Sequence, residues 1–277
     1  MDSKSATGRS RADGDVRPTI SSVFSKGKAF IAYLTAGDPA LEQTPELVLA
    51  LERGGADLIE LGVPFSDPIA DGPVIQRASE RALRGGATLP KLLETVSEIR
   101  LHSQIPLVLF SYLNPLLRYG FDQLARDAAA AGINGVLLTD LSVEEAAEPV
   151  SRLRQQGLDT VFLAAPTSSE RRLRLVAEHS SGFVYLVSRT GVTGEQATLA
   201  ASAAPLTKRM RQLTQLPLAL GFGVSTPEQV AEVARLADGV VVGSAIVKFI
   251  EANAHSPQLA ANLEAFTRRL TAPLRQP

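Results

Sequence analysis

The sequence predicts a single (β/α)8 barrel, and three observations support this prediction. Its 277 residues are close to the roughly 250 that eight strand-helix units require. Short apolar runs, typical of strands buried on both faces, alternate with amphipathic segments along the chain. No long linker or change in composition interrupts this alternation. An open doubly wound sheet is the alternative that the pattern leaves.

Eight segments are expected to form the barrel strands, because each is short and nearly continuous in apolar residues. They are Phe30–Thr35, Asp57–Gly62, Ile105–Ser111, Gly135–Thr139, Thr160–Ala164, Phe183–Val187, Leu216–Gly221 and Gly239–Gly243. Capping residues predict where three of the intervening helices begin. The capping pairs are Ser142 with Glu145, Thr167 with Glu170, and Thr226 with Gln229.

The chain is expected to consist of a short tail followed by one catalytic domain. Residues 1–17 are polar and have no hydrophobic period, which predicts a flexible tail. The barrel domain then covers residues 18–277. Acidic residues in the tail argue against a transit peptide, and no apolar stretch typical of a secretory signal is present there.

Composition excludes several classes of function. The chain has no cysteine, which rules out disulfides, thiolate nucleophiles and sulfur-ligated metals. Its formal net charge of −1 offers no field for nucleic acid or anionic lipid. No apolar run approaches the 18 or more residues typical of a membrane helix. We therefore expect a soluble cytoplasmic protein with no nucleic-acid or membrane partner.

Elimination narrows the chemistry to carboxylates. The three histidines, His102, His179 and His255, fall late in helical segments or just beyond them, where a solvated side chain is the usual role. No lysine ends a predicted barrel strand, as a Schiff-base mechanism would require. Nucleotide-binding loops, a nucleophile elbow and clusters with metal-ligand spacing are all missing from the sequence. The sequence therefore predicts no metal site and no cofactor in this chain.

Glu60 is the first candidate catalytic residue. It lies two positions before the end of an apolar strand, so the period of two can direct its side chain into the barrel mouth. Burial would raise the pKa of this carboxyl group toward neutrality, as a general acid or base requires. The alternative is a structural carboxylate satisfied by backbone donors or by an arginine.

Asp71 is the second candidate. It follows Glu60 by eleven positions in a proline-rich loop that can fold back over the mouth. Two acids in one pocket can have pKa values that are pushed apart, which gives one acid and one base. Asp67 and Asp71 could equally be turn residues before Pro68 and Gly72.

Glycines at two strand ends predict a phosphate site. Gly221 and Gly223 close the seventh predicted strand, and Gly243 with Ser244 opens the last predicted unit's helix. Backbone N–H groups and the positive end of a helix would converge there. Gly194, in the loop after the sixth strand, could let that loop close on the same anion. Plain turn residues are the alternative interpretation of these glycines.

Six motifs follow one another along the chain. The longest is Glu60-Leu-Gly-Val-Pro-Phe-Ser-Asp-Pro-Ile-Ala-Asp-Gly-Pro-Val-Ile-Gln76. The others are Tyr33-Leu-Thr-Ala-Gly-Asp-Pro39, Tyr112-Leu-Asn-Pro115, Ser188-Arg-Thr-Gly-Val-Thr-Gly194, Gly221-Phe-Gly-Val224 and Gly243-Ser-Ala-Ile-Val-Lys248. They cover essentially everything after the tail, and together they resemble the tryptophan synthase alpha chain family.

This resemblance implies a lyase that cleaves indole-3-glycerol phosphate to indole and glyceraldehyde 3-phosphate. Glu60 resembles the residue that moves protons between the substrate hydroxyl and indole C3, and Asp71 the residue that interacts with the indole N–H. The residues implied for the indole and glycerol pocket are Tyr33, Tyr112, Tyr185, Thr193 and Phe222. Those implied for the phosphate are Gly194, Gly223, Gly243 and Ser244. A protonated indole is its own electron sink, which agrees with the lack of a suitable lysine or metal cluster.

The resemblance also implies a partner. Family members pass indole to a β subunit, which holds pyridoxal phosphate, in an α2β2 assembly. A stand-alone lyase and a catalytically silent barrel that only regulates a partner are the alternatives. The chain departs from the family pattern in its long tail and at Thr139-Asp140-Leu-Ser142, where we expect a proline on either side of Asp-Leu. Neither departure touches Glu60 or Asp71.

Overall fold

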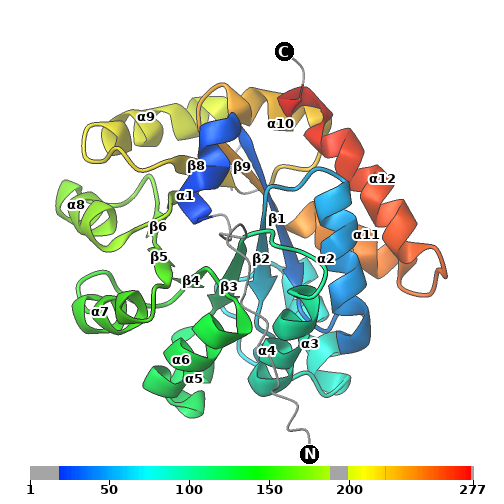
Figure 1. Ribbon diagram of the computed structural model, residues 1–277. Coiled ribbons are helices and arrows are strands. Elements are labelled where there is room, and N and C mark those ends of the chain that lie inside the picture. The colour runs from blue at the N-terminus through cyan, green and yellow to red at the C-terminus, as the bar shows by residue number, and fades with distance from the viewer. Residues whose placement is uncertain (1–18, 188–198, 222, 276–277) are drawn as a thin grey trace, which may run out of the picture.

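The computed structural model describes residues 19–187, 199–221 and 223–275, which form a parallel barrel inside a ring of helices (Figure 1). Its strands are β1 Ala29–Thr35, β2 Leu58–Gly62, β3 Leu107–Ser111, β4 Gly135–Leu138, β5 Asp159–Val161, β6 Leu163–Ala164, β7 Val184–Val187, β8 Leu218–Gly221 and β9 Gly239–Val242. Their order is β5-β4-β3-β2-β1-β9-β8-β7-β6, and the pairings are parallel. The predicted tail, residues 1–17, lies outside the described residues.

The sheet closes on itself because its two end strands are halves of one segment. β5 and β6 are separated only by Phe162; β5 pairs with β4, whereas β6 pairs with β7. The predicted barrel is therefore confirmed, and the open-sheet alternative is wrong. The prediction of one continuous fifth strand is also wrong, since its backbone pairing changes from one neighbour to the other at Phe162.

The helices cover the outside of the barrel, as Figure 1 shows. They are α2 Thr44–Arg53, α3 Pro73–Arg84, α4 Leu89–Ile99, α5 Leu113–Tyr119, α6 Phe121–Ala131, α7 Ala147–Gln155, α8 Glu170–His179, α9 Leu199–Arg211, α10 Pro227–Ala234, α11 Ser244–Asn253 and α12 Leu259–Thr271. Three short 3-10 turns, Phe24–Lys26, Leu41–Gln43 and Ala272–Leu274, join or end these elements. An outer apolar core fills the space between the strands and this ring.

A second apolar core fills the barrel interior. Its members alternate along each strand with residues of the outer core, as the strand period requires. They include Ile31, Leu58, Val108, Leu137, Val161, Phe183, Tyr185, Ala219 and Val241. Each large apolar side chain buried in this way contributes roughly 1.5–3 kcal/mol to folding. The interior is thus a packed core, and space for a substrate is left only at its ends.

A short helix closes the end of the barrel where the strands begin. α1, Ile20–Val23, has Thr19 as its N-cap and directs the fully buried Ile20 into the interior core. The Phe24 ring that follows lies 5.8 Å from the ring of Phe183. This packing leaves the opposite end, at the carboxyl ends of the strands, as the place for a site.

One of the three predicted helix starts is confirmed and two are wrong. Thr226 and Gln229 form a capping box at the start of α10. At α8 the N-cap is Ser169, which accepts from the Arg172 N–H, because a turn held by Ser168 carries the loop past Thr167. α7 begins only at Ala147, and the Ser142 hydroxyl donates to Glu144 instead of capping a helix.

Candidate active site at the barrel mouth

Glu60 lies inside the barrel, as predicted. β2 pairs with β1 so that Glu60 faces Tyr33, and its side chain follows the inward-facing Leu58. Glu60 is 1% exposed, and its Oε1 has no hydrogen-bond partner among the described residues. Burial raises the pKa of Glu60 to about 8, so the carboxyl group is neutral at pH 7. A structural carboxylate would have hydrogen-bond partners for both of its oxygens. The unpaired, buried Oε1 of Glu60 therefore favours the catalytic interpretation.

Asp71 sits in the loop between β2 and α3 and is partly buried. Its backbone N–H donates to Pro68 O at 3.0 Å, and the Gln76 side chain donates to Asp71 O at 2.9 Å, which ties the loop to α3. Burial raises the pKa of Asp71 to about 6, against an opposing interaction with the Tyr112 hydroxyl. Asp67, by contrast, is exposed and bonded to Ser66 and Ile69, as a turn residue would be.

Tyr33 connects the two carboxylates. Burial raises its pKa, and the negative charges of Asp71 and Glu60 raise it further, so both acids lie within electrostatic range of this hydroxyl. The hydroxyl lies 3.3 Å from Thr35 Oγ1. The Phe110 ring meets the Tyr33 ring edge-on at 5.1 Å between centroids. The structure thus places both predicted catalytic residues around one tyrosine of the predicted pocket.

Tyr112 and Tyr185 complete the aromatic wall. The Tyr112 hydroxyl accepts from the Ala70 N–H at 2.9 Å, and its ring lies 5.2 Å from that of Phe65. Burial raises the pKa of Tyr185, and the charge of Glu60 adds to the shift. Tyr112 therefore holds the loop of Asp71, while Tyr185 lies beside Glu60 in the interior core.

Two glycines make room for the hydroxyl groups of Tyr33 and Tyr185. Sequence reasoning singled out Gly221 but missed Gly62. A Cβ on Gly62 would lie 2.2 Å from the Tyr33 hydroxyl, and one on Gly221 would lie 2.4 Å from the Tyr185 hydroxyl. Thr35 was missed as well. Its position two residues after Tyr33 on the same strand face was the signal that could have found it.

The predicted phosphate residues are only partly described. Gly243 is the N-cap of α11, and Ser244 is the first residue of that helix, so the N–H groups of its first turn face the mouth. A Cβ on Gly243 would lie 3.4 Å from Tyr33 Cβ, which places this helix start beside the pocket. Gly223 has φ of +76° and is exposed. Thr193, Gly194 and Phe222 lie outside the described residues.

The three histidines occupy the positions expected from sequence. His102, His179 and His255 lie at or beyond helix ends. Across residues 19–187, 199–221 and 223–275, no group of three or more His, Asp or Glu side chains is placed to hold a metal ion. Within the same ranges, no helix is long and apolar enough to cross a membrane.

The fold and the mouth define a (β/α)8 barrel with two carboxyl groups of raised pKa at the mouth. A family model for the tryptophan synthase alpha chain matches residues 22–274. The tryptophan synthase alpha chain of Solibacter usitatus is 65% identical over 243 residues, which cover 88% of this chain and 91% of that protein. The corresponding protein of Geotalea uraniireducens is 54% identical over 224 residues, or 81% and 84%.

Solved structures agree with these sequences. A Mycobacterium tuberculosis tryptophan synthase structure has a TM-score of 0.84 at 38% identity and covers 93% of this chain and 98% of that one. A mutant alpha subunit from Pyrococcus furiosus has a TM-score of 0.81 at 41% identity and covers 89% and 99%. The chain belongs to the tryptophan synthase alpha chain family. It is therefore a carbon–carbon lyase of tryptophan biosynthesis. The reaction of this family needs no cofactor.

Proposed function

We propose that Glu60 and Asp71 carry the cleavage of indole-3-glycerol phosphate to indole and glyceraldehyde 3-phosphate. The observation that supports this assignment is the pair of unequal carboxyl groups, with a pKa of about 8 for the buried Glu60 and about 6 for Asp71. At neutral pH one is an acid and the other a carboxylate. The retro-aldol step needs one group of each kind.

The proton balance of the reaction closes on Glu60. Neutral Glu60 donates its proton to indole C3, which creates a positively charged indolenine. The C–C bond to the glycerol chain then breaks, and its electron pair flows into the ring and restores indole. Glu60, now a carboxylate, takes the proton of the adjacent hydroxyl as that carbon becomes the aldehyde. The Asp71 carboxylate stabilises the charge on the ring nitrogen while it lasts.

The remaining predicted residues bind the substrate in this proposal. Tyr33, Tyr112, Tyr185, Thr193 and Phe222 surround the indole and glycerol parts. Gly194, Gly223, Gly243 and Ser244 hold the phosphate with backbone N–H groups and the start of α11. No metal or Schiff base takes part, because protonation at C3 already supplies the electron sink.

We further propose that the chain works as the cytoplasmic α component of an α2β2 assembly and passes indole to a pyridoxal-phosphate β subunit. Its membership of the family supports this, since the related Mycobacterium tuberculosis structures are described as tryptophan synthase. The division into a tail of residues 1–17 and a barrel domain of 18–277 belongs to the same proposal. The lack of cysteine fits a reducing compartment.

Two substitutions test the catalytic pair. Glu60→Gln should abolish indole release and leave the affinity for glycerol 3-phosphate within about tenfold, because ground-state binding of the phosphate does not need the proton transfer. Asp71→Asn should be nearly as damaging to turnover. Equal loss of binding and turnover in the first variant, or wild-type turnover in the second, would contradict the assigned role.

A second assay tests the partner. Indole release from indole-3-glycerol phosphate is measured for the purified chain with and without a tryptophan synthase β subunit. Weak activity that rises on addition of β is the expected result. Full activity of the chain alone would instead favour a stand-alone lyase, and no activity in either condition would favour a silent regulatory barrel.

A further inference from the structure

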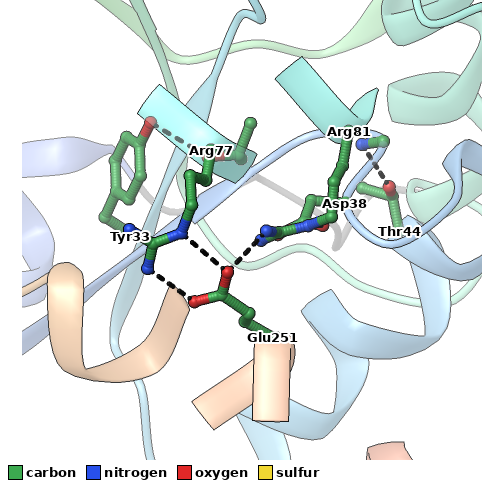
Figure 2. Close-up of polar contacts among 8 residues, drawn as sticks. Tyr33, Asp38, Thr44, Arg77, Arg81 and Glu251 are labelled. Atoms are coloured by element: carbon green, nitrogen blue, oxygen red, sulfur yellow. Dashed lines mark hydrogen bonds and ion pairs between the residues drawn. The ribbon is translucent and has the colours of Figure 1, made fainter. Parts of the chain in front are cut away.

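Four charged residues form a cluster beside the mouth that the proposed chemistry does not use (Figure 2). Arg81 donates two hydrogen bonds to the Asp38 carboxylate, at 2.7 Å to Oδ1 and 2.9 Å to Oδ2. A third N–H of Arg81 donates to Glu251 at 2.7 Å. Arg77 donates to both oxygens of Glu251 at 2.9 Å each. Arg81 is thus the residue that joins the two carboxylates.

Burial of Asp38 separates this cluster from ordinary surface ion pairs, whereas the side chain of Arg77 is 50% exposed. Asp38 is 1% exposed, and the side chains of Arg81 and Glu251 are 27% and 29% exposed. Hydrogen bonds from Arg77 and then Arg81 lower the pKa of Glu251 to about 2, so this carboxylate stays charged at neutral pH. A planar guanidinium is the side chain that can chelate one carboxylate and still reach another.

The cluster connects three elements, and two of them, α3 and α11, begin beside Asp71 and at the proposed phosphate site. Asp38 lies in the loop after β1, Arg77 and Arg81 lie on α3, and Glu251 lies on α11. α3 begins two residues after Asp71 and is tied to that residue by the Gln76 side chain. α11 begins at the proposed phosphate site, Ser244. Its distance from α3 therefore sets the distance from Asp71 to the phosphate.

Packing under the cluster leads to the same three elements. Tyr33 of β1, Ala78 of α3 and Val247 of α11 form one buried apolar group. The loop of Asp38 also fits tightly on α3, since a Cβ on Gly37 would lie 3.2 Å from Ala82 Cβ on that helix. The Gly37 N–H donates to Thr44 Oγ1 at 3.0 Å. A change in the α3–α11 spacing would therefore move Tyr33 and the loop of Asp71 together.

We propose that Arg81 is a positioning residue, which clamps α3 to α11 and to the loop after β1 and so holds Asp71 at a fixed distance from the phosphate site. This proposal rests on the proposed roles of Asp71 and Ser244. Misplacement of a catalytic group by about 1 Å can cost on the order of 100-fold in rate. Loss of the clamp should consequently lower kcat more than it weakens substrate binding.

The test compares Arg81→Gln and Arg81→Lys with a matched control, Arg84→Gln. Arg84 lies on the same helix and pairs with Glu80 at 3.2 Å on the exposed face. For each variant, kcat and KM for indole release and the affinity for glycerol 3-phosphate are measured. Arg81→Gln should lower kcat about tenfold or more with KM and phosphate affinity within threefold. Arg81→Lys should restore little, because an ammonium group cannot chelate Asp38 and also reach Glu251.

Amide hydrogen exchange supplies a readout that does not require activity. The N–H groups of Ala70 and Asp71 should exchange faster in Arg81→Gln and at the wild-type rate in Arg84→Gln. If Arg81→Gln does not fold, Glu251→Ala removes the bridge to α11 and keeps the buried Asp38–Arg81 pair. Wild-type kcat and exchange in the folded variants would overturn the clamp. If the wild-type chain is inactive and Ala70 and Asp71 nevertheless exchange faster in Arg81→Gln, the result would count against the proposed function and support the clamp.

Discussion

Burial gives Glu60 and Asp71 different protonation states at neutral pH, although both are carboxylic acids. Glu60 on β2 is shielded on all sides and has a pKa raised to about 8. Asp71 in the loop keeps contact with solvent and with the Tyr112 hydroxyl, and its pKa rises only to about 6. The chemistry of the site is therefore set by the environment of each residue, and chemical type alone does not distinguish them.

This pair predicts a bell-shaped dependence of kcat/KM on pH. Glu60 is protonated below about pH 8, and Asp71 is ionised above about pH 6, so the productive combination is most populated between these values. Activity should fall on both sides when the free chain is assayed from pH 5 to 9.5 at constant ionic strength. The low residual activity of Asp71→Asn should lose the acidic limb and keep the alkaline one. A wild-type profile that is flat through pH 6 would contradict the role of Asp71.

Gly62 gives a second prediction at this scale. An alanine Cβ there would lie 2.2 Å from the buried Tyr33 hydroxyl, so the ring must move out of its position. Gly62→Ala should destabilise the chain by roughly 1–3 kcal/mol, as overpacking does, and should lower indole release. Urea unfolding measures the first effect. Gly85→Ala is the control, because its Cβ would make an ordinary contact at 3.4 Å; equal stability of both variants would be inconsistent with the steric argument.

At the scale of elements, the start of each helix decides where its loop ends. α8 begins after Ser169, whose side chain accepts from the Arg172 N–H, and Thr167 is exposed in the preceding turn. Ser169→Ala should therefore cost about 1 kcal/mol in the free energy of unfolding, whereas Thr167→Ala should change it by less than about 0.5 kcal/mol. Chemical denaturation of the two variants compares them directly. A larger loss of unfolding free energy in Thr167→Ala than in Ser169→Ala would show that Thr167 is the N-cap, as expected from sequence.

At the scale of the whole molecule, the two ends of the barrel have different tasks. The mouth carries the proposed catalytic groups, and α1 closes the other end with Ile20, which is fully buried against Gly135 and Gly182. In barrels of this kind the active site lies at the carboxyl ends of the strands, and the other end serves to stabilise the fold. A substitution at the closed end should thus separate stability from activity.

Ile20→Ala makes this separation measurable. The loss of a buried isoleucine should lower the free energy of unfolding by about 2–5 kcal/mol, because the rigid strands around it cannot collapse into the cavity. At a temperature well below the melting point, kcat and KM should stay within twofold of wild type. A large change in kcat of the folded variant would show that the packing at the closed end reaches the mouth.

Local sequence pattern was sufficient for the barrel and for its main catalytic candidate. Eight apolar runs in alternation with amphipathic segments reflect burial on both faces of parallel strands, which is a property of each segment by itself. Glu60 stood out because it is an acid at an inward position of such a run. Ser244 stood out because it follows a strand-ending glycine at a helix start. These features depend on periods of two and 3.6 residues, which can be counted along the chain.

Tertiary structure alone decided the contacts between residues that are far apart in sequence. Asp38 and Glu251 meet Arg81 across 43 and 170 residues, and the Tyr33 hydroxyl rests against Gly62 on the neighbouring strand. No periodicity encodes these distances, because they follow from how closely the helices and strands pack once the barrel closes. For the same reason, the sequence alone offered Glu60 and Asp71 as candidate acids, while their unequal burial, and hence their different pKa values, arose only in the folded chain.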